Sequence, residues 1–271
     1  MNRSIVIAFI VLCAAISALS QQRLMLAGGG KRPTEAIRKF VDWSGGNKAK
    51  ILVITWASGV PGESFAAITE DFSAFKTASI ENAPIAPIGT YERIKLIDQV
   101  KNATGIFFTG GDQNRIMDVF KDAELLKIVR EKYSKGTPIG GTSAGTAVMS
   151  DPMITGEADL KIIDGSKVGT RPGVGLLPGT ILDQHFIQRQ RENRLFGLVM
   201  KHPSKLGVGI DEDTVLMVEN NRIADVIGET QVMFVDAKDR NGALLIHLVK
   251  AGDSFDLQKR RPLAKANAAR P

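Results

Sequence analysis

Ser143 lies between two glycines in the pattern Gly-x-Ser-x-Gly, at residues 141–145. The pattern follows a short segment, residues 138–140, that is expected to end a strand, and it precedes residues expected to begin a helix. At such a junction the glycines permit a sharp turn that exposes the serine hydroxyl, and amide groups at the helix N-terminus can stabilise an oxyanion. Ser143 is therefore a candidate nucleophile. The alternative is a serine that only caps the helix.

A serine nucleophile needs a base, and the chain contains three histidines. His202 lies in a polar bend, and His247 interrupts an apolar run that is expected to form a strand. His185 follows Asp183 and Gln184 and precedes a segment rich in arginine. Only His185 lies among groups that could bind a charged substrate, so it is the candidate base.

Three consecutive glycines, residues 28–30, follow an apolar run at residues 23–27. This arrangement resembles the start of a dinucleotide-binding turn, but Pro33 occupies the place of the third glycine of that motif. The acidic residue expected about twenty residues further on is also absent. We favour close packing of the backbone against a sheet as the reason for these glycines.

The elements that must position Ser143 alternate along the first half of the chain. Predicted strands and helices follow one another at residues 23–27, 34–43, 51–56, 63–75, 105–109 and 113–120. Strands separated by helices require parallel crossovers, which predicts an α/β fold with helices on both faces of a mostly parallel sheet. From residue 208 onward, short apolar runs broken by turn residues predict antiparallel strands added to one edge.

Composition narrows the class of protein. With 271 residues, 44% hydrophobic and 24% charged, the chain suits one globular domain and excludes a disordered, collagen-like or disulfide-stapled protein. We expect a single catalytic domain at residues 21–257.

Residues 1–20 differ from the rest of the chain. A short positive start, an apolar run from Ile5 to Ala18 and small residues before Gln21 predict a secretory signal peptide, with an uncleaved anchor helix as the alternative. The only cysteine, Cys13, lies inside this segment. The mature chain would therefore contain no thiol nucleophile, disulfide or Cys-bound zinc, and we expect it to be secreted without stable membrane association.

Residues 258–271 predict a basic, disordered tail. The 35 basic residues less Arg3, set against 29 acidic residues, leave the mature chain a net charge of +5. This charge is modest, so we expect no nucleic-acid partner, although nucleic-acid binding by the tail is a second interpretation.

Four motifs in order resemble the cyanophycinase family, serine exopeptidases related to dipeptidase E. They are Phe-Thr-Gly-Gly-Asp-Gln at 108–113, Gly-Thr-Ser-Ala-Gly at 141–145, Asp-Gln-His-Phe at 183–186 with the arginines that follow, and Gly-Ile-Asp-Glu-Asp-Thr at 209–214. The resemblance extends from about residue 24 to residue 256. It implies a three-layer α/β/α sandwich of the flavodoxin-like or glutamine-amidotransferase-like type, no metal or other cofactor, and a homodimer.

The resemblance also implies roles for individual residues. Ser143 matches the nucleophile, His185 the general base, and Glu212 the acid that orients the base. Amides of Gly111 and Ala144 match the oxyanion hole. The dipeptidase E branch places its acid between the serine and the histidine, where the candidates are Glu157, Asp159 and Asp164.

Six further positions match the family's substrate pocket: Gln113, Asp183, Gln184, Arg189, Arg191 and Arg194. The substrate of that family, cyanophycin, is a polyaspartate whose β-carboxyl groups each carry arginine. Arginine side chains would bind its free carboxylates, and Asp183 would pair with a substrate guanidinium. At about 100° per residue a regular helix cannot point all three arginines at one pocket. Either the segment begins irregularly after His185, or one arginine has a structural or intersubunit role.

The resemblance implies hydrolysis of cyanophycin to β-Asp-Arg dipeptides through an acyl-enzyme. Three alternatives remain: an aspartyl or isoaspartyl dipeptidase on the same scaffold, an α/β-hydrolase esterase, and a polymer-binding protein without turnover. The esterase would use His247 after an acid such as Asp211 or Asp213.

Overall fold

The computed structural model describes residues 21–239 and 241–264 of the chain. The predicted signal peptide, residues 1–20, lies outside the described residues, and so do residues 265–271 of the predicted tail. Within the described ranges, no helix is long and apolar enough to cross a membrane.

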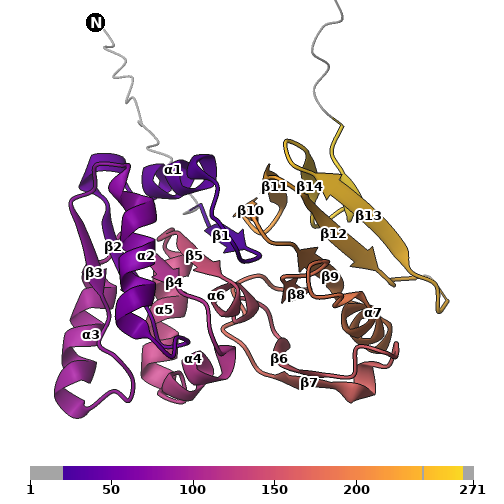
Figure 1. Cartoon of the computed structure of the whole chain (residues 1–271), viewed down its shortest axis with the longest axis horizontal. Coiled ribbons are helices and arrows are strands. Elements are labelled where there is room, and N and C mark those ends of the chain that lie inside the picture. The colour runs from indigo at the N-terminus through magenta and orange to yellow at the C-terminus, as the bar shows by residue number, and fades with distance from the viewer. Residues whose placement is uncertain (1–20, 240, 265–271) are drawn as a thin grey trace, which may run out of the picture.

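The largest sheet has nine strands, in the order β15-β14-β11-β10-β1-β5-β4-β2-β3 (Figure 1). Its parallel part consists of β1 (Arg23–Ala27), β2 (Lys50–Ile54), β3 (Ser79–Asn82), β4 (Gly105–Phe108) and β5 (Ile139–Thr142). The apolar runs predicted β1, β2 and β4 to within two residues. The sequence did not predict β3, because only one of its four residues is apolar.

Alternation along β1 shows why this sheet is covered on both faces. Leu24 and Leu26 belong to one buried cluster, whereas Met25 and Ala27 belong to another. Side chains on a strand point alternately to opposite faces, so β1 contributes to two cores.

Helices cover each face of the parallel strands. Phe40 of α1 (Thr34–Trp43) and Phe72 of α2 (Pro61–Ser73) pack with Met25. The opposite face, with Leu24, is covered by α3 (Thr90–Asn102), α4 (Gln113–Val119), α5 (Ala123–Ser134) and the short α6 (Ala144–Ala147). Two short 3-10 helices are η1 (Gly46–Lys48) and η2 (Gly165–Lys167). The predicted α/β fold with helices on both faces of the parallel strands is confirmed.

The strands from β8 onward form two groups, and their pairing is antiparallel except between β8 and β9, which are parallel. β10 (Thr214–Glu219), β11 (Ile223–Gly228), β14 (Ser254–Asp256) and β15 (Arg261–Pro262) extend the large sheet beyond β1, as expected. β8 (Thr180–Gln184), β9 (Leu206–Ile210), β12 (Gln231–Asp236) and β13 (Leu245–Lys250) instead form a separate sheet, in the order β13-β12-β9-β8. This second sheet was not predicted, because apolar runs indicate strands but not their partners.

The second sheet packs between the large sheet and α7 (Glu192–Lys201). Phe234 and Val208 share a buried cluster with Leu24, while Val235 of the same sheet packs with Leu195 of α7. A two-stranded ribbon, β6 (Met153–Ala158) and β7 (Val168–Arg171), connects α6 to β8. One continuous core therefore joins the two larger sheets.

The described chain continues past the boundary expected at residue 257. β15 pairs with β14, and the Leu263 amide donates to the Ser254 carbonyl over 2.9 Å. Arg260 donates to Asp236 and to the carbonyl of Ser204, over 2.5 Å in each case. Residues 258–264 are thus attached to both larger sheets, in contrast to the disordered tail that composition suggested.

Candidate active site

Ser143 occupies a sharp turn between β5 and α6. Its backbone has φ 53° and ψ −113°, a conformation that residues with a side chain rarely adopt. The two flanking glycines make the turn possible. A Cβ on Gly141 would lie 2.4 Å from the carbonyl carbon of Gly145, and a Cβ on Gly145 would lie 2.2 Å from the carbonyl oxygen of Phe108. Only glycine fits these two positions.

The turn is attached to β1 by hydrogen bonds. The Ser143 amide donates to the Ala27 carbonyl over 3.1 Å. The Thr146 hydroxyl lies 2.7 Å from the same carbonyl oxygen and 2.9 Å from that of Gly141. These contacts hold the strained serine in one position.

Three strands end where Ser143, His185 and Glu212 meet. His185 directly follows β8, and Glu212 follows β9 by two residues. His185 Nε2 lies 2.7 Å from Ser143 Oγ, and His185 Nδ1 lies 2.5 Å from Glu212 Oε1. The structure therefore brings the three residues into the hydrogen-bonded order that a nucleophile, a base and an orienting acid would need.

The triple glycine lies directly behind the imidazole. A Cβ on Gly29, whose φ is 129°, would lie 2.1 Å from His185 Cε1. The His185 amide donates to the Gly28 carbonyl over 2.8 Å, and the Asp213 amide donates to the Gly29 carbonyl over 3.0 Å. The expected close packing is what the structure contains, and it positions the loops that carry the base and the acid. The sequence indicates a role for these glycines but not their contact with His185, because the two segments are far apart in the chain.

The loop after β4 lies against the serine. A Cβ on Gly110 would lie 3.3 Å from Ser143 Cβ, and Gly111 has φ 133°. A side chain at Gly111 would overlap the carbonyl of Ala57, which accepts the Asp112 amide over 2.9 Å. This packing explains why glycines occupy the expected oxyanion loop.

The other expected donor, Ala144, begins α6 directly after Ser143, at the positive end of that helix.

Burial sets the protonation of His185. The pKa of this imidazole is lowered from 6.5, chiefly because burial disfavours the charged ring, and the positive charge of Arg189 lowers it further. The hydrogen bond with Glu212 acts in the opposite direction and is smaller. The neutral form therefore prevails near pH 7, and only that form can accept the serine proton.

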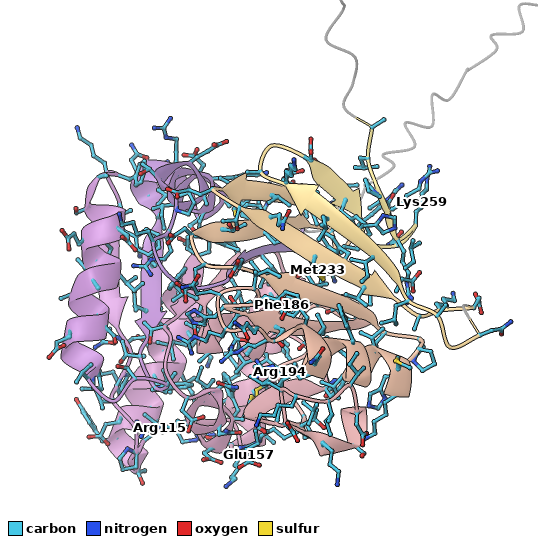
Figure 2. All side chains as sticks on the ribbon, turned by 45° about the vertical axis from the view of Figure 1, so that its right-hand side comes forward. Arg115, Glu157, Phe186, Arg194, Met233 and Lys259 are labelled. Carbon is cyan, nitrogen blue, oxygen red and sulfur yellow. The ribbon has the colours of Figure 1, made fainter. Side chains whose placement is uncertain are left out.

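Asp183 and Arg194 were expected to face substrate, but they pair with each other. Arg194 donates to both carboxylate oxygens of Asp183, and its Nε lies 2.7 Å from Oδ2. Asp183 has no exposed surface and Arg194 is 2% exposed. Figure 2 labels Arg194 together with Phe186, the residue that directly follows His185. The prediction that Asp183 pairs with a substrate guanidinium is therefore wrong. Its carboxylate is already paired with the buried Arg194 guanidinium.

The segment between His185 and α7 is irregular. Residues 186–190 form turns, His185 and Gln190 have positive φ, and the helix begins only at Glu192. Both explanations for the three arginines therefore apply, because the segment starts irregularly and Arg194 points inward.

Arg189 and Arg191 have different surroundings. Arg189 is exposed beside His185. Arg191 donates to the Gln184 carbonyl over 2.7 Å, and burial together with the charge of Arg194 lowers its pKa to about 10. Both remain candidates for binding substrate carboxylates.

Gln113 and Gln184 are both nearly buried. Gln113 donates to the Ile154 carbonyl over 2.7 Å and is 6% exposed, so its amide group braces the β6–β7 ribbon against α4. Gln184 is 5% exposed, and its Oε1 has no hydrogen-bond partner in the described part of the chain. Gln184 therefore has a buried acceptor without a partner among the described residues.

His247, the base that the esterase alternative requires, lies elsewhere. His247 is in β13, where its ring centroid is 5.6 Å from that of Phe255. Of the competing acids, Asp164 accepts the Ser166 amide at the start of η2, and Asp211 accepts the amides of Gln188 and Glu212. These acids are therefore engaged with backbone amides, whereas the Glu212 carboxylate reaches His185.

The other candidate acids are Asp213, Glu157 and Asp159. Asp213 accepts the Lys31 amide, while Glu157 and Asp159 belong to β6 and the hairpin after it. Across residues 21–239 and 241–264, no group of three or more His, Cys, Asp or Glu side chains is placed to hold a metal ion.

Comparison with known proteins decides the family. The sequence model of peptidase family S51 matches residues 24–226. The chain belongs to peptidase family S51. This S51 peptidase is 34% identical to the cyanophycinase of Trichormus variabilis over 248 residues, covering 84% of this chain and 82% of that protein. It is 28% identical to a peptidase E of Nostoc sp. over 156 residues, covering 53% of this chain and 62% of that protein.

The fold of this S51 peptidase is shared with a solved structure. The crystal structure of a peptidase from an acI-B1 Actinobacterium superposes with a TM-score of 0.65 at 19% identity, covering 88% of this chain and 98% of that one. The family and its relatives make this protein a serine-type peptidase, and the resemblance to cyanophycinase inferred from four motifs is confirmed.

Proposed function

We propose that this S51 peptidase is a secreted exopeptidase that hydrolyses cyanophycin and releases β-Asp-Arg dipeptides. The hydrogen-bonded chain of Ser143, His185 and Glu212 is the observation that carries the reaction. The choice of substrate rests on the cyanophycinases, which are similar over more than four-fifths of the chain. Secretion rests on the predicted signal peptide, residues 1–20.

In the proposed mechanism, neutral His185 takes the Ser143 proton as Oγ attacks the carbonyl carbon of the scissile amide. The resulting oxyanion is held by amide donors of Gly111 and Ala144, and each such donor contributes about a hundredfold or more in rate. The imidazolium is stabilised by Glu212 and then gives its proton to the leaving amine. The C–N bond breaks, and an acyl-enzyme remains on Ser143.

Hydrolysis of the acyl-enzyme repeats these steps with water. His185 removes a proton from the water molecule, whose oxygen attacks the ester carbonyl, and then returns a proton to Ser143 Oγ. Arg189 and Arg191 are the groups that we assign to the free carboxylates of the substrate, because arginine binds carboxylates through two parallel hydrogen bonds.

Incubating residues 21–271 with insoluble cyanophycin tests this proposal. Mass spectrometry of the soluble fraction should detect β-Asp-Arg, and S143A should release none while its circular dichroism matches the parent. Full activity of S143A would overturn the proposed nucleophile. His185→Ala should lower kcat/KM by several orders of magnitude, whereas His247→Ala should not, and the reverse result would favour the esterase alternative.

A dipeptidase for short aspartyl or isoaspartyl peptides is the second candidate. The similarity to peptidase E favours it. Cleavage of such peptides without release from the polymer would replace our proposal with this one, and co-sedimentation with the polymer without any product would favour a binding protein without turnover. The resemblance to cyanophycinase also leads us to expect a homodimer, which analytical ultracentrifugation would test.

A further inference from the structure

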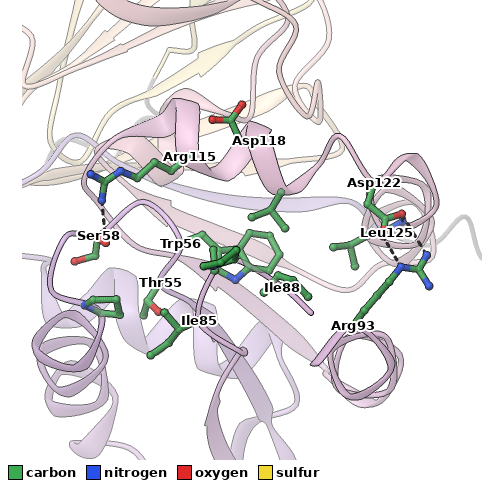
Figure 3. A pocket seen from close by; sticks show the side chains of 14 residues that line it. Thr55, Trp56, Ser58, Ile85, Ile88, Arg93, Arg115, Asp118, Asp122 and Leu125 are labelled. Atoms are coloured by element: carbon green, nitrogen blue, oxygen red, sulfur yellow. Dashed lines mark hydrogen bonds and ion pairs between the residues drawn. The ribbon is translucent and has the colours of Figure 1, made fainter. Parts of the chain in front are cut away.

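A cavity of about 520 Å³ lies at the carboxyl ends of β2 and β3, between their following loops and α3, α4 and α5. Ser143, His185 and Glu212 are not among the described residues that line it. Figure 3 shows Trp56 and Ile88 in its centre, Arg115 beside Ser58 on one side, and the Arg93–Asp122 pair on the other. Its volume is typical of a pocket for a small organic ligand.

The cavity and the nucleophile lie on two sides of one loop. Ser58 lines the cavity, and the preceding residue, Ala57, accepts the amide of Asp112. A Cβ on Gly111 would lie 2.1 Å from the Ala57 oxygen, and one on Gly110 would lie 3.3 Å from Ser143 Cβ. Direct contacts therefore run from the cavity wall, through the Gly110–Gly111 loop, to the serine.

The floor of the cavity is apolar. Trp56 is 3% exposed, and its Nε1 donates to the Pro84 carbonyl over 2.9 Å, so the indole ring has no further donor to offer a ligand. Ile85 is 55% exposed at the rim, an unusual exposure for an isoleucine that lines a cavity. This surface suits the methylene groups of a long side chain.

The charged side chains that line the cavity differ in how many hydrogen bonds and ion pairs they already make. Arg93 donates to both Asp122 and Glu124. Arg115, in contrast, makes one long hydrogen bond within the described residues, 3.4 Å from Nη1 to the Ser58 carbonyl. Asp118 is already paired, because its Oδ1 lies 3.1 Å from Lys121 Nζ and 3.4 Å from Arg171 Nη2. The guanidinium of Arg115 is thus the least engaged of these charged groups and is available to a ligand carboxylate.

We propose that this cavity binds a second aspartyl-arginine unit of the substrate polymer while another unit lies at Ser143. Arg115 binds the free carboxylate of that unit, and the methylene groups of its arginine lie over Trp56 and Ile85. The inference rests on the proposed function, because it needs a polymer that repeats these groups. Two linked contacts bind a polymer much more tightly than one, since the second contact is intramolecular.

The test compares Ile85→Asp with Ile94→Asp in the chain of residues 21–271. A carboxylate at position 85 repels the substrate carboxylate and interrupts the apolar rim, whereas Ile94 is 64% exposed on α3 and does not line the cavity. We measure kcat/KM on the polymer and on a soluble fragment of two repeats. The ratio of kcat/KM on the polymer to kcat/KM on the fragment should fall about tenfold or more in Ile85→Asp. It should stay at the parent value in Ile94→Asp.

A second variant keeps the test informative if Ile85→Asp does not fold. Arg115→Gln should lower the same ratio, and Arg115→Lys, which retains the charge, should restore part of it. An unchanged ratio in both Ile85→Asp and Arg115→Gln would overturn the inference.

A binding measurement separates this inference from the proposed function. With S143A as the background, Ile85→Asp should weaken co-sedimentation with the polymer, and Ile94→Asp should not. If the parent releases no product but this difference in binding is present, the proposed hydrolysis is rejected and the second binding site is kept. If the parent releases product and both variants bind the polymer equally, the second binding site is rejected and the proposed hydrolysis is kept.

Discussion

At the scale of single residues, the unusual features are the backbone of Ser143 and the pKa of His185. A positive φ at a serine costs about 1 to 3 kcal/mol, and the hydrogen bonds from Ser143 and Thr146 to the Ala27 carbonyl offset part of that cost. The lowered pKa of His185 keeps the imidazole neutral to below pH 6.5. The proposed base is therefore in its proton-accepting form before substrate arrives.

The pH dependence follows from this pKa. Protonation of His185 removes the base, so kcat/KM should fall as the pH drops, with a midpoint below 6.5. Arg189 contributes to the lowered pKa, so Arg189→Gln should shift the midpoint to higher pH. Arg38→Gln removes an exposed arginine that does not perturb His185 and should leave the midpoint in place. A midpoint that stays or moves down in Arg189→Gln would contradict this account, whatever the change in KM.

At the scale of elements, the Gly28–Gly30 loop connects β1 with the turns that carry His185 and Glu212. It does so through backbone hydrogen bonds and through the absence of a side chain at Gly29. A loop without side chains can lie against an imidazole ring closely enough to fix its orientation. The position of the base thus depends on an element that carries no reactive group itself.

Gly29→Ala tests this dependence, with Gly45→Ala as the matched control. Both glycines have positive φ, 129° and 110°, so each alanine should cost about 1 to 3 kcal/mol of stability. Only the alanine at position 29 would displace His185, because the nearest atom to a Cβ at position 45 is 3.8 Å away. We expect kcat to fall about a hundredfold in Gly29→Ala and less than twofold in Gly45→Ala. Equal losses would indicate that backbone strain alone matters.

The Asp183–Arg194 pair connects β8 with α7. Asp183→Asn leaves a buried guanidinium without its counter-charge, which should cost about 3 to 5 kcal/mol in urea unfolding. Lys127→Ala, which removes an exposed pair with Glu131, should cost less than about 1 kcal/mol. If Asp183 bound substrate instead, Asp183→Asn would raise KM and leave the stability unchanged.

At the scale of the whole molecule, two sheets share one core, and residues 258–264 connect them at the surface. β15 extends the large sheet, while Arg260 reaches Asp236 of the second sheet. A segment that the composition marks as a basic tail therefore contributes contacts between distant parts of the chain.

Truncation measures this contribution. A chain that ends at Leu257 should unfold about 4 °C or more below one that ends at Ala264, because it loses the β15 pairing and both hydrogen bonds of Arg260. The two chains should have equal kcat/KM on a short substrate, since none of these residues lies near Ser143 in the structure described above. Equal melting temperatures would mean that the segment adds no stability.

The sequence by itself determined the local features of this protein. The glycines of residues 141–145 require a tight turn, and the alternation of apolar runs with helical segments requires parallel crossovers. The neighbouring groups that could bind a charged substrate set His185 apart from His202 and His247 without any structure. These inferences succeed because they depend on backbone sterics and on residues close together in the chain.

Only the tertiary structure decided which distant groups meet. Nothing local distinguishes Arg194, which is buried against Asp183, from Arg189, which is exposed, because burial depends on the irregular turns that precede α7. The second sheet, the contact of Gly29 with His185 and the cavity beside Ser58 likewise arise between segments far apart in sequence. A sequence pattern reports the tendency of a segment to form an element. The partners of that element are selected by packing of the whole chain, and here that packing places an acid, a base and a serine at the ends of three strands.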